Sequence, residues 1–156
     1  MNYQKRINPW WAVLTVWVVV NTVNLLQSMG FLSRVITGDR SINHYFGYGI
    51  IALALPAALT IIGFIRRKAG WRLWIGPVAF LAFVVFMIVV EYIWKAEFRS
   101  PMRYDILVPY LVLFFGSIFL MGSPMFRIDR RRWLVTVVTT VLLLGSMIYA
   151  MYMGVG

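Results

Sequence analysis

The sequence predicts an all-α integral membrane protein, built as a bundle of five transmembrane helices. Hydrophobic residues make up 62% of the 156 residues and charged residues only 13%, against roughly 45–50% and about 25% in a soluble globular chain. The apolar residues form five runs separated by short polar segments. Most Lys and Arg residues lie in those segments, as is typical of loops between transmembrane helices.

We expect these five runs to form one transmembrane domain over residues 1–156. The spans are expected at about residues 9–32, 46–65, 73–94, 106–121 and 133–153. The first run follows Lys5 and Arg6 but is too long for a cleaved signal peptide, so we interpret it as a retained helix. Pro56 lies in the middle of the second span and is expected to kink it. The fourth span is the shortest.

The distribution of positive charge predicts the orientation of the bundle. Ten Lys and Arg residues lie in the N-terminal tail and in loops 66–72 and 125–132, and five lie in loops 33–45 and 95–105. Cytoplasmic loops carry the excess of Lys and Arg. We therefore expect the N-terminus in the cytoplasm, the C-terminus outside, and the protein integral to a plasma or inner membrane.

The third span contains Glu91, the only charged residue inside an apolar run. A carboxylate within a span usually faces the bundle interior, a water-filled cavity or a partner. Lys95 follows four residues later, in the favourable order for an ion pair on a helix. Two interpretations remain open: an interfacial ion pair that fixes the helix position, or a group that accepts a proton or binds a cation.

Polar residues in the first span form a second feature. Asn21, Asn24 and Ser28 share one helix face, and Gln27 flanks that face. Because amides in lipid need hydrogen-bond partners, we expect these side chains to point at other helices. In the predicted orientation they lie in the outer half of the first span, which is also the half of the bundle that contains Glu91.

Two further polar residues, His44 and Asp105, lie beside the outer starts of the second and fourth spans. The polar groups of this layer either hold helices together or form a small polar pocket that opens to the outside. A single histidine cannot supply both axial ligands of a bis-histidine haem, but it could be one ligand beside a methionine or a partner subunit. We predict no cofactor and keep haem or quinone as an alternative.

The fifth span carries three threonines, Thr136, Thr139 and Thr140, on one face of its cytoplasmic half. Threonine at this spacing commonly bonds back to its own helix or to a neighbouring helix. We therefore expect these hydroxyl groups to bond to their own helix or to a neighbouring helix.

The predicted cytoplasmic side is strongly basic. Its loop cations could bind anionic lipid headgroups or an acidic partner, or could act only as the topology signal. They are Arg66, Arg67, Lys68, Arg72, Arg127, Arg130, Arg131 and Arg132. Although the net charge is +10, we do not expect a nucleic-acid partner, because the basic residues are confined to short loops between apolar runs.

Absent motifs narrow the functional classes. The chain has no cysteine, which excludes disulfides and thiolate metal sites. It also lacks a Walker loop and the H-E-x-x-H and G-x-S-x-G motifs. We therefore predict no catalytic residue and no metal site, which argues against an enzyme.

Three functional hypotheses follow from these observations. The first is an accessory or structural subunit of a larger membrane complex or of a homo-oligomer. The second is a small carrier or channel-like protein in which an outward-facing pocket around Glu91 binds a proton, a cation or a small polar solute. The third is a redox subunit associated with haem or quinone.

Overall fold

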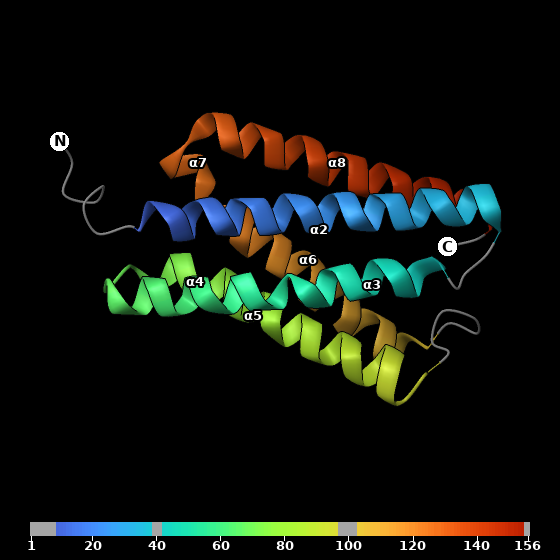
Figure 1. The fold of residues 1–156 in the computed structure, drawn as a ribbon. Helices are drawn as coiled ribbons and strands as arrows, with labels where there is room; N and C mark the ends of the chain where they lie inside the picture. Colours follow the sequence, from blue (N-terminus) through green and yellow to red (C-terminus); the bar gives the residue numbers. More distant parts are fainter. Residues whose placement is uncertain (1–8, 39–41, 97–102, 155–156) are drawn as a thin grey trace.

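The computed structural model describes residues 9–38, 42–96 and 103–154. Within these ranges all regular structure is helical, and five segments are long and apolar enough to cross a membrane (Figure 1). These segments are Trp10–Thr37, His44–Arg66, Trp71–Ile93, Tyr104–Ile128 and Arg130–Tyr152. The predicted all-helical fold with five candidate spans is confirmed. Lys5 and Arg6 of the N-terminal tail lie outside the described residues.

The first span forms a single helix, α2 (Trp10–Thr37), which continues five residues past the predicted end at residue 32. Arg34 lies within this extension and is buried, with its guanidinium 4.8 Å from the centroid of the Phe31 ring. The helix ends at Gly38, which has a φ of 69° and donates its N–H to the Arg34 carbonyl at 2.9 Å. The helix is longer than predicted because Arg34 packs against an apolar neighbour instead of belonging to a solvated loop.

The second span consists of two helices, α3 (Ile42–Ala52) and α4 (Ala54–Arg66), which meet at Leu53. Pro56 has no N–H and cannot bond to the carbonyl of Ala52. The break lies three residues before Pro56, which is consistent with the predicted kink.

The end of α4 is closed by a Schellman motif in which a lysine takes the left-handed position. Lys68 has a φ of 51° and donates its N–H to the Ile65 carbonyl at 3.0 Å. Ala69 donates to the Phe64 carbonyl at 2.9 Å, and the side chains of these two residues are both buried. Glycine is the usual residue at the left-handed position, because it has no Cβ.

The third span begins as α5 (Trp71–Met87) and ends as a π-helical segment, η1 (Ile88–Ile93). The wider π turn is closed where Trp94 donates its N–H to the Val89 carbonyl at 2.8 Å. Lys95 follows with a φ of 48°, and Ala96 donates to the Val90 carbonyl at 3.0 Å. This end therefore repeats the arrangement at Lys68, with lysine before alanine in a left-handed turn.

The last three helices are α6 (Tyr104–Gly122), the short α7 (Met125–Ile128) and α8 (Arg130–Tyr152). The fourth span is thus longer than the predicted range 106–121. Asp129 joins α7 to α8 and caps α8. Its Oδ1 accepts from the backbone N–H groups of Arg131 at 3.0 Å and Arg132 at 3.3 Å.

Helix α2 lies between α8 and the pair formed by α3 and α4, and α6 crosses behind it (Figure 1). The most extensive contacts join α5 to α6 and α2 to α8, and α4 packs on both α5 and α2. Helix α8 packs chiefly against α2, with α7 as its other main contact. It is therefore attached to the bundle along one side.

At Gly76 the backbones of α5 and α6 approach each other closely. A Cβ placed on Gly76 would lie 2.7 Å from the backbone nitrogen of Met121 and within 2.9 Å of the backbone of Leu120. The two helices therefore meet backbone to backbone at this point, which only a glycine allows.

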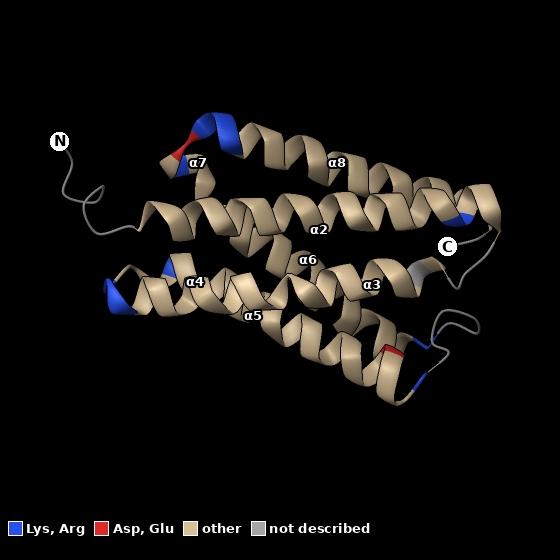
Figure 2. Ribbon diagram, in the orientation of Figure 1, with Lys and Arg blue, Asp and Glu red and all other residues tan. Residues whose placement is uncertain are grey.

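The charged residues lie at the two ends of the bundle (Figure 2). We refer to one end as the basic end: it contains the start of α2, the turn between α4 and α5, and the corner between α7 and α8. The opposite end contains the C-terminal end of α2, the start of α3, η1 and the start of α6.

Candidate functional site

Buried polar side chains meet at the contact between α2 and α8, within two of the candidate membrane spans. Asn24 is fully buried, Asn21 is 8% exposed, and their partners on α8 are threonines that are buried or half-buried. We refer to this set as the polar clasp; its members are Asn21, Asn24, Thr136, Thr139 and Thr140. Polar groups in this position lower their free energy only by bonding to one another.

Asn21 bonds in three directions. Its Nδ2 donates to the Trp17 carbonyl at 2.7 Å and to Thr136 Oγ1 at 3.2 Å. Its Oδ1 accepts from Thr139 Oγ1 at 2.8 Å. Asn21 therefore uses its donors and its acceptor, and two of the three bonds link α2 to α8.

Asn24 extends the clasp by one turn. Its Nδ2 donates to Thr139 Oγ1 at 3.1 Å and to Thr140 Oγ1 at 3.0 Å. The hydroxyl of Thr140 donates to the Thr136 carbonyl at 2.7 Å, and that of Thr136 donates to the Arg132 carbonyl at 3.2 Å. The threonines thus bond both to their own helix and to a neighbour, as predicted, and every polar hydrogen of the clasp has an acceptor.

One acceptor of the clasp is left over. In the part of the chain that the structure describes, no donor reaches Asn24 Oδ1, although the residue is fully buried. A buried carbonyl without a donor is destabilising. Asn24 therefore stabilises the α2–α8 contact less than its two donated bonds alone would suggest.

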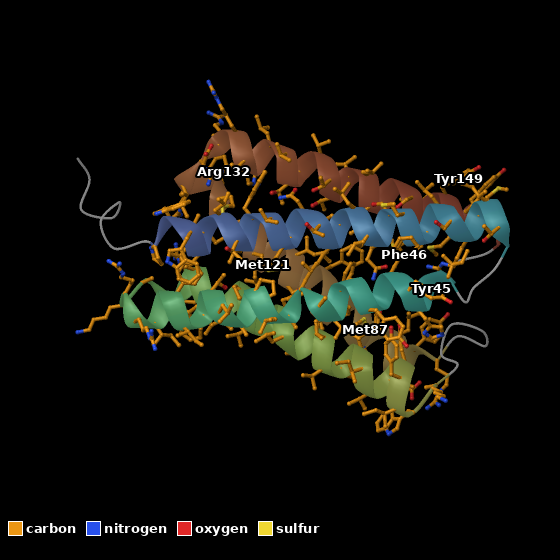
Figure 3. The ribbon with its side chains drawn as sticks, in the orientation of Figure 1. Tyr45, Phe46, Met87, Met121, Arg132 and Tyr149 are labelled. Carbon is orange, nitrogen blue, oxygen red and sulfur yellow. The ribbon has the colours of Figure 1, made fainter. Side chains whose placement is uncertain are left out.

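The clasp lies toward the basic end of α8. Trp17 of α2 donates its indole N–H to the Arg132 carbonyl in the first turn of α8 at 2.9 Å. Figure 3 shows Arg132 at this start of α8 and Tyr149 near its other end. Polar bonds therefore hold the first half of α8 to α2.

The predicted amide face is confirmed in part. Asn21 and Asn24 point at another helix, as expected, and Ser28 is buried and donates to the Asn24 carbonyl at 2.8 Å. Gln27 is half-buried beside this face. The expected position in the outer half of the span is corrected: because α2 continues to Thr37, Asn21 and Asn24 lie near its middle.

A second group of contacts ties η1 to α3 at the opposite end. Tyr92 donates its hydroxyl to the His44 carbonyl at 3.1 Å. Its ring lies 5.7 Å from the ring of His44 and 5.2 Å from that of Tyr48, measured between centroids. The Tyr92 hydroxyl also lies directly over Gly47, where a Cβ would collide with it. We refer to these contacts as the tyrosine contact.

Glu91 precedes Tyr92 in η1 and is half-buried. Lys95 lies beyond the end of η1 in a left-handed conformation, so the helical spacing that predicted a Glu91–Lys95 ion pair does not continue through it. His44 is exposed, and Asp105 forms an exposed ion pair with Arg103 at 2.8 Å.

These positions divide the predicted pocket residues into two groups. Asn21 and Asn24 belong to the clasp between α2 and α8. At the opposite end, His44 is part of the tyrosine contact and Glu91 precedes Tyr92 in η1. A pocket shared by Glu91 and the amides stays a prediction. Within the described ranges, no group of three His, Asp or Glu residues is arranged to hold a metal ion.

The basic end contains all eight predicted loop cations. Arg132 pairs with Asp129 at 3.2 Å between Nε and Oδ2, and the other seven are exposed. The guanidinium of Arg72 lies 5.7 Å from the centroid of the Trp71 ring. Phe126 and Trp133 meet edge to face with centroids 5.0 Å apart. Cations and aromatic rings therefore share this end of the bundle.

Several residues at these contacts were not singled out by the sequence. Trp17, Gly47 and Tyr92 make their contacts with residues far away in the chain, and nothing in the local sequence distinguishes them from other aromatic residues and glycines. The usable signals were the amide face of the first span and the threonine spacing of the fifth span, because amides and hydroxyls on an apolar helix require partners.

No protein-family model, curated protein or solved structure matches this chain. The functional proposals below therefore rest on the residues and their geometry.

Proposed function

We propose that the chain is a membrane-embedded accessory or structural subunit, which assembles laterally with other membrane chains or with copies of itself. In this proposal the five candidate spans cross a plasma or inner membrane with the basic end in the cytoplasm. The observation that carries the proposal is the polar clasp. Its buried amides and hydroxyls are bonded to one another and to the helix backbone, so they hold α8 in place instead of lining a binding site.

The outer face of α8 supports lateral assembly. This helix packs chiefly on α2 and exposes large apolar side chains such as Val141 and Ile148, both 62% exposed. Gly145 lies on the same face, and a Cβ there would meet nothing within 4 Å. A small residue between bulky ones lets a second helix approach closely.

Native mass spectrometry of the protein, gently extracted from its own membrane, tests this proposal. We expect a mass above 18.1 kDa that dissociates into several chains at fixed stoichiometry. A lone chain under conditions that preserve other membrane assemblies would contradict the proposal.

The variant Gly145→Leu locates the interface. A leucine at this position would prevent close approach at the outer face of α8, so we expect the assembly to dissociate while the bundle stays folded. The matched control is Val85→Leu on the exposed face of α5, which should leave the assembly intact. Equal behaviour of the two variants would exclude this face of α8.

The second candidate function is a small carrier or channel-like protein with Glu91 as its proton- or cation-binding group. The specific observation in its favour is that Glu91 lies in a π-helical segment, because such segments occur frequently at functional sites. Glu91→Gln should abolish a proton or cation flux in liposomes, and Asp105→Asn, at the exposed ion pair, should preserve it. Unchanged flux in Glu91→Gln would remove this residue from the mechanism.

The third candidate is a redox subunit in which exposed His44 lies near a haem or quinone. It predicts a visible absorption spectrum in the purified protein, or the appearance of one on adding haem. A preparation that stays colourless after haem addition would contradict the haem form of this proposal.

A further inference from the structure

The basic end is distinguished by cations that lack carboxylate partners. Asp129 is the one carboxylate that the described residues place there; it caps α8 and pairs with Arg132. In the same described part, the other cations of this end are exposed and form no ion pair with a carboxylate. They are Arg66, Arg67, Lys68, Arg72, Arg127, Arg130 and Arg131. The charge of these seven residues is therefore available to an external anion.

These cations form two groups on short, well-defined turns. The first lies on the Schellman turn between α4 and α5, where the buried side chains of Phe64 and Ala69 fix the backbone. The second lies at the α7–α8 corner, where buried Met125 and the capping carboxylate of Asp129 fix the chain. Neither group can move far from its helix ends.

Aromatic rings mark the depth at which these cations lie. Trp71 and Trp10 are 58% and 75% exposed at the same end, and Phe126 is 52% exposed beside Trp133. Exposed tryptophan rings beside apolar spans lie at the level of lipid headgroups. Cations at this level meet phosphate groups of lipids before they meet a soluble partner.

We propose that the basic end binds anionic phospholipid headgroups, with Arg127, Arg130 and Arg131 at the α7–α8 corner as the principal site. Guanidinium groups match phosphate oxygens in pairs, and three of them on one corner can surround a phosphate-bearing headgroup. The opposite end offers no comparable cluster among its described residues: its exposed cations are Lys95 and Arg103, and Arg103 pairs with Asp105. This inference goes beyond lateral assembly and does not depend on it.

The test uses the full chain in detergent, with phosphatidylglycerol or phosphatidylcholine of identical acyl chains added, and counts retained lipids by native mass spectrometry. Purified protein avoids the inversion of topology that loss of loop charge could cause in a cell. The variant is R127Q/R130Q/R131Q, which leaves Asp129 and Arg132 in place. The matched control is K95Q/R103Q at the opposite end, whose cations are likewise exposed.

Wild type should retain phosphatidylglycerol at least about tenfold more strongly than phosphatidylcholine. The triple variant should lose most of this preference, and the control should keep it. In wild type, ~1 M salt should also weaken the preference, because it screens exposed charges. This salt measurement tests the proposal even if the triple variant unfolds.

Three results would overturn the proposal. These are equal retention of the two lipids by wild type, an unchanged preference in a folded triple variant, and full displacement of phosphatidylglycerol by soluble polyglutamate at matched charge. The last result would show that an acidic polypeptide, not a lipid, is the preferred partner. Intrinsic tryptophan fluorescence on heating establishes in each case that the variant is folded.

Discussion

Thr139 of α8 donates a hydrogen bond of 2.8 Å to the side-chain carbonyl of Asn21 on α2, across 118 residues of sequence. Both residues are buried, and they lie within two of the candidate membrane spans. This bond is the shortest of those that join the two helices side chain to side chain in the polar clasp. Since α8 packs chiefly on α2, the clasp is central to how the fifth span is held.

A double-mutant cycle should therefore detect coupling between Asn21 and Thr139. Asn21→Leu and Thr139→Val each remove the bond while keeping an apolar volume. We expect a coupling energy of about 0.6 kcal/mol, the average for hydrogen bonds between membrane helices. The measurement is unfolding in mixed detergents, followed by fluorescence of the seven tryptophans. Strict additivity of the two single changes would contradict an interaction between these side chains.

Asn24 provides a comparison within the same clasp. Asn24→Leu removes two donated bonds, but it also removes a buried carbonyl that no described donor reaches. We therefore expect Asn24→Leu to destabilise the bundle less than Asn21→Leu, which removes three satisfied bonds. The same unfolding assay compares the two variants. The reverse order would mean that Asn24 Oδ1 has a partner such as bound water.

Gly76→Ala should separate α5 from α6. The added methyl group would lie 2.7 Å from the Met121 nitrogen, and backbone atoms cannot rotate away as side chains can. We expect a loss of about 1–3 kcal/mol, the usual range for overpacking. Gly116→Ala on α6 is the matched control, because its added Cβ would meet nothing within 4 Å. It should be neutral or slightly stabilising, through its better helix propensity.

The five apolar runs and the effect of Pro56 could be predicted from the sequence, because hydropathy and the missing N–H of proline act locally. The end of α2 could not. Arg34 resembles a loop residue in the sequence, whereas in the structure it lies within α2 with its guanidinium over the Phe31 ring. The wider turn of η1 also has no compositional signal, since its residues other than Glu91 are of the same apolar and aromatic types as those of α5.

The candidate site could likewise be predicted from the sequence only in part. The sequence indicated that Asn21 and Asn24 need partners, and the threonine face of the fifth span was a correct signal of polar contacts. It could not indicate that these two sets meet, because the rotation of one apolar helix against another depends on the whole bundle. The sequence grouped the amides with Glu91 only because it predicted a similar depth in the membrane for both. It held no information about contact between them.

The two lysines in left-handed turns should be replaceable by glycine with a gain in stability. Lys68 and Lys95 have φ values of 51° and 48°, a region in which a side chain costs roughly 1–2 kcal/mol. We expect Lys68→Gly and Lys95→Gly each to raise the unfolding free energy by up to about 1 kcal/mol, after the entropy cost of glycine. Lys68→Ala and Lys95→Ala are the controls, because they remove the charge but keep the Cβ. If alanine stabilises as much as glycine, loss of charge repulsion and not backbone relief is the cause.

At the tyrosine contact, we expect Tyr92→Phe to remove most of the destabilisation that Gly47→Ala causes. Gly47→Ala should destabilise the bundle because its Cβ would collide with the hydroxyl of Tyr92. Tyr92→Phe alone should cost about 0.5–1.5 kcal/mol, through loss of the 3.1 Å bond to the His44 carbonyl.

In the double variant the nearest ring atom would be about 3.5 Å from the new methyl group, an ordinary contact distance. Gly47→Ala should therefore be nearly neutral in the Tyr92→Phe background, as measured by the same unfolding in mixed detergents. An equal loss in both backgrounds would mean that the hydroxyl of Tyr92 does not lie over Gly47, and that the end of η1 is held to α3 in some other way.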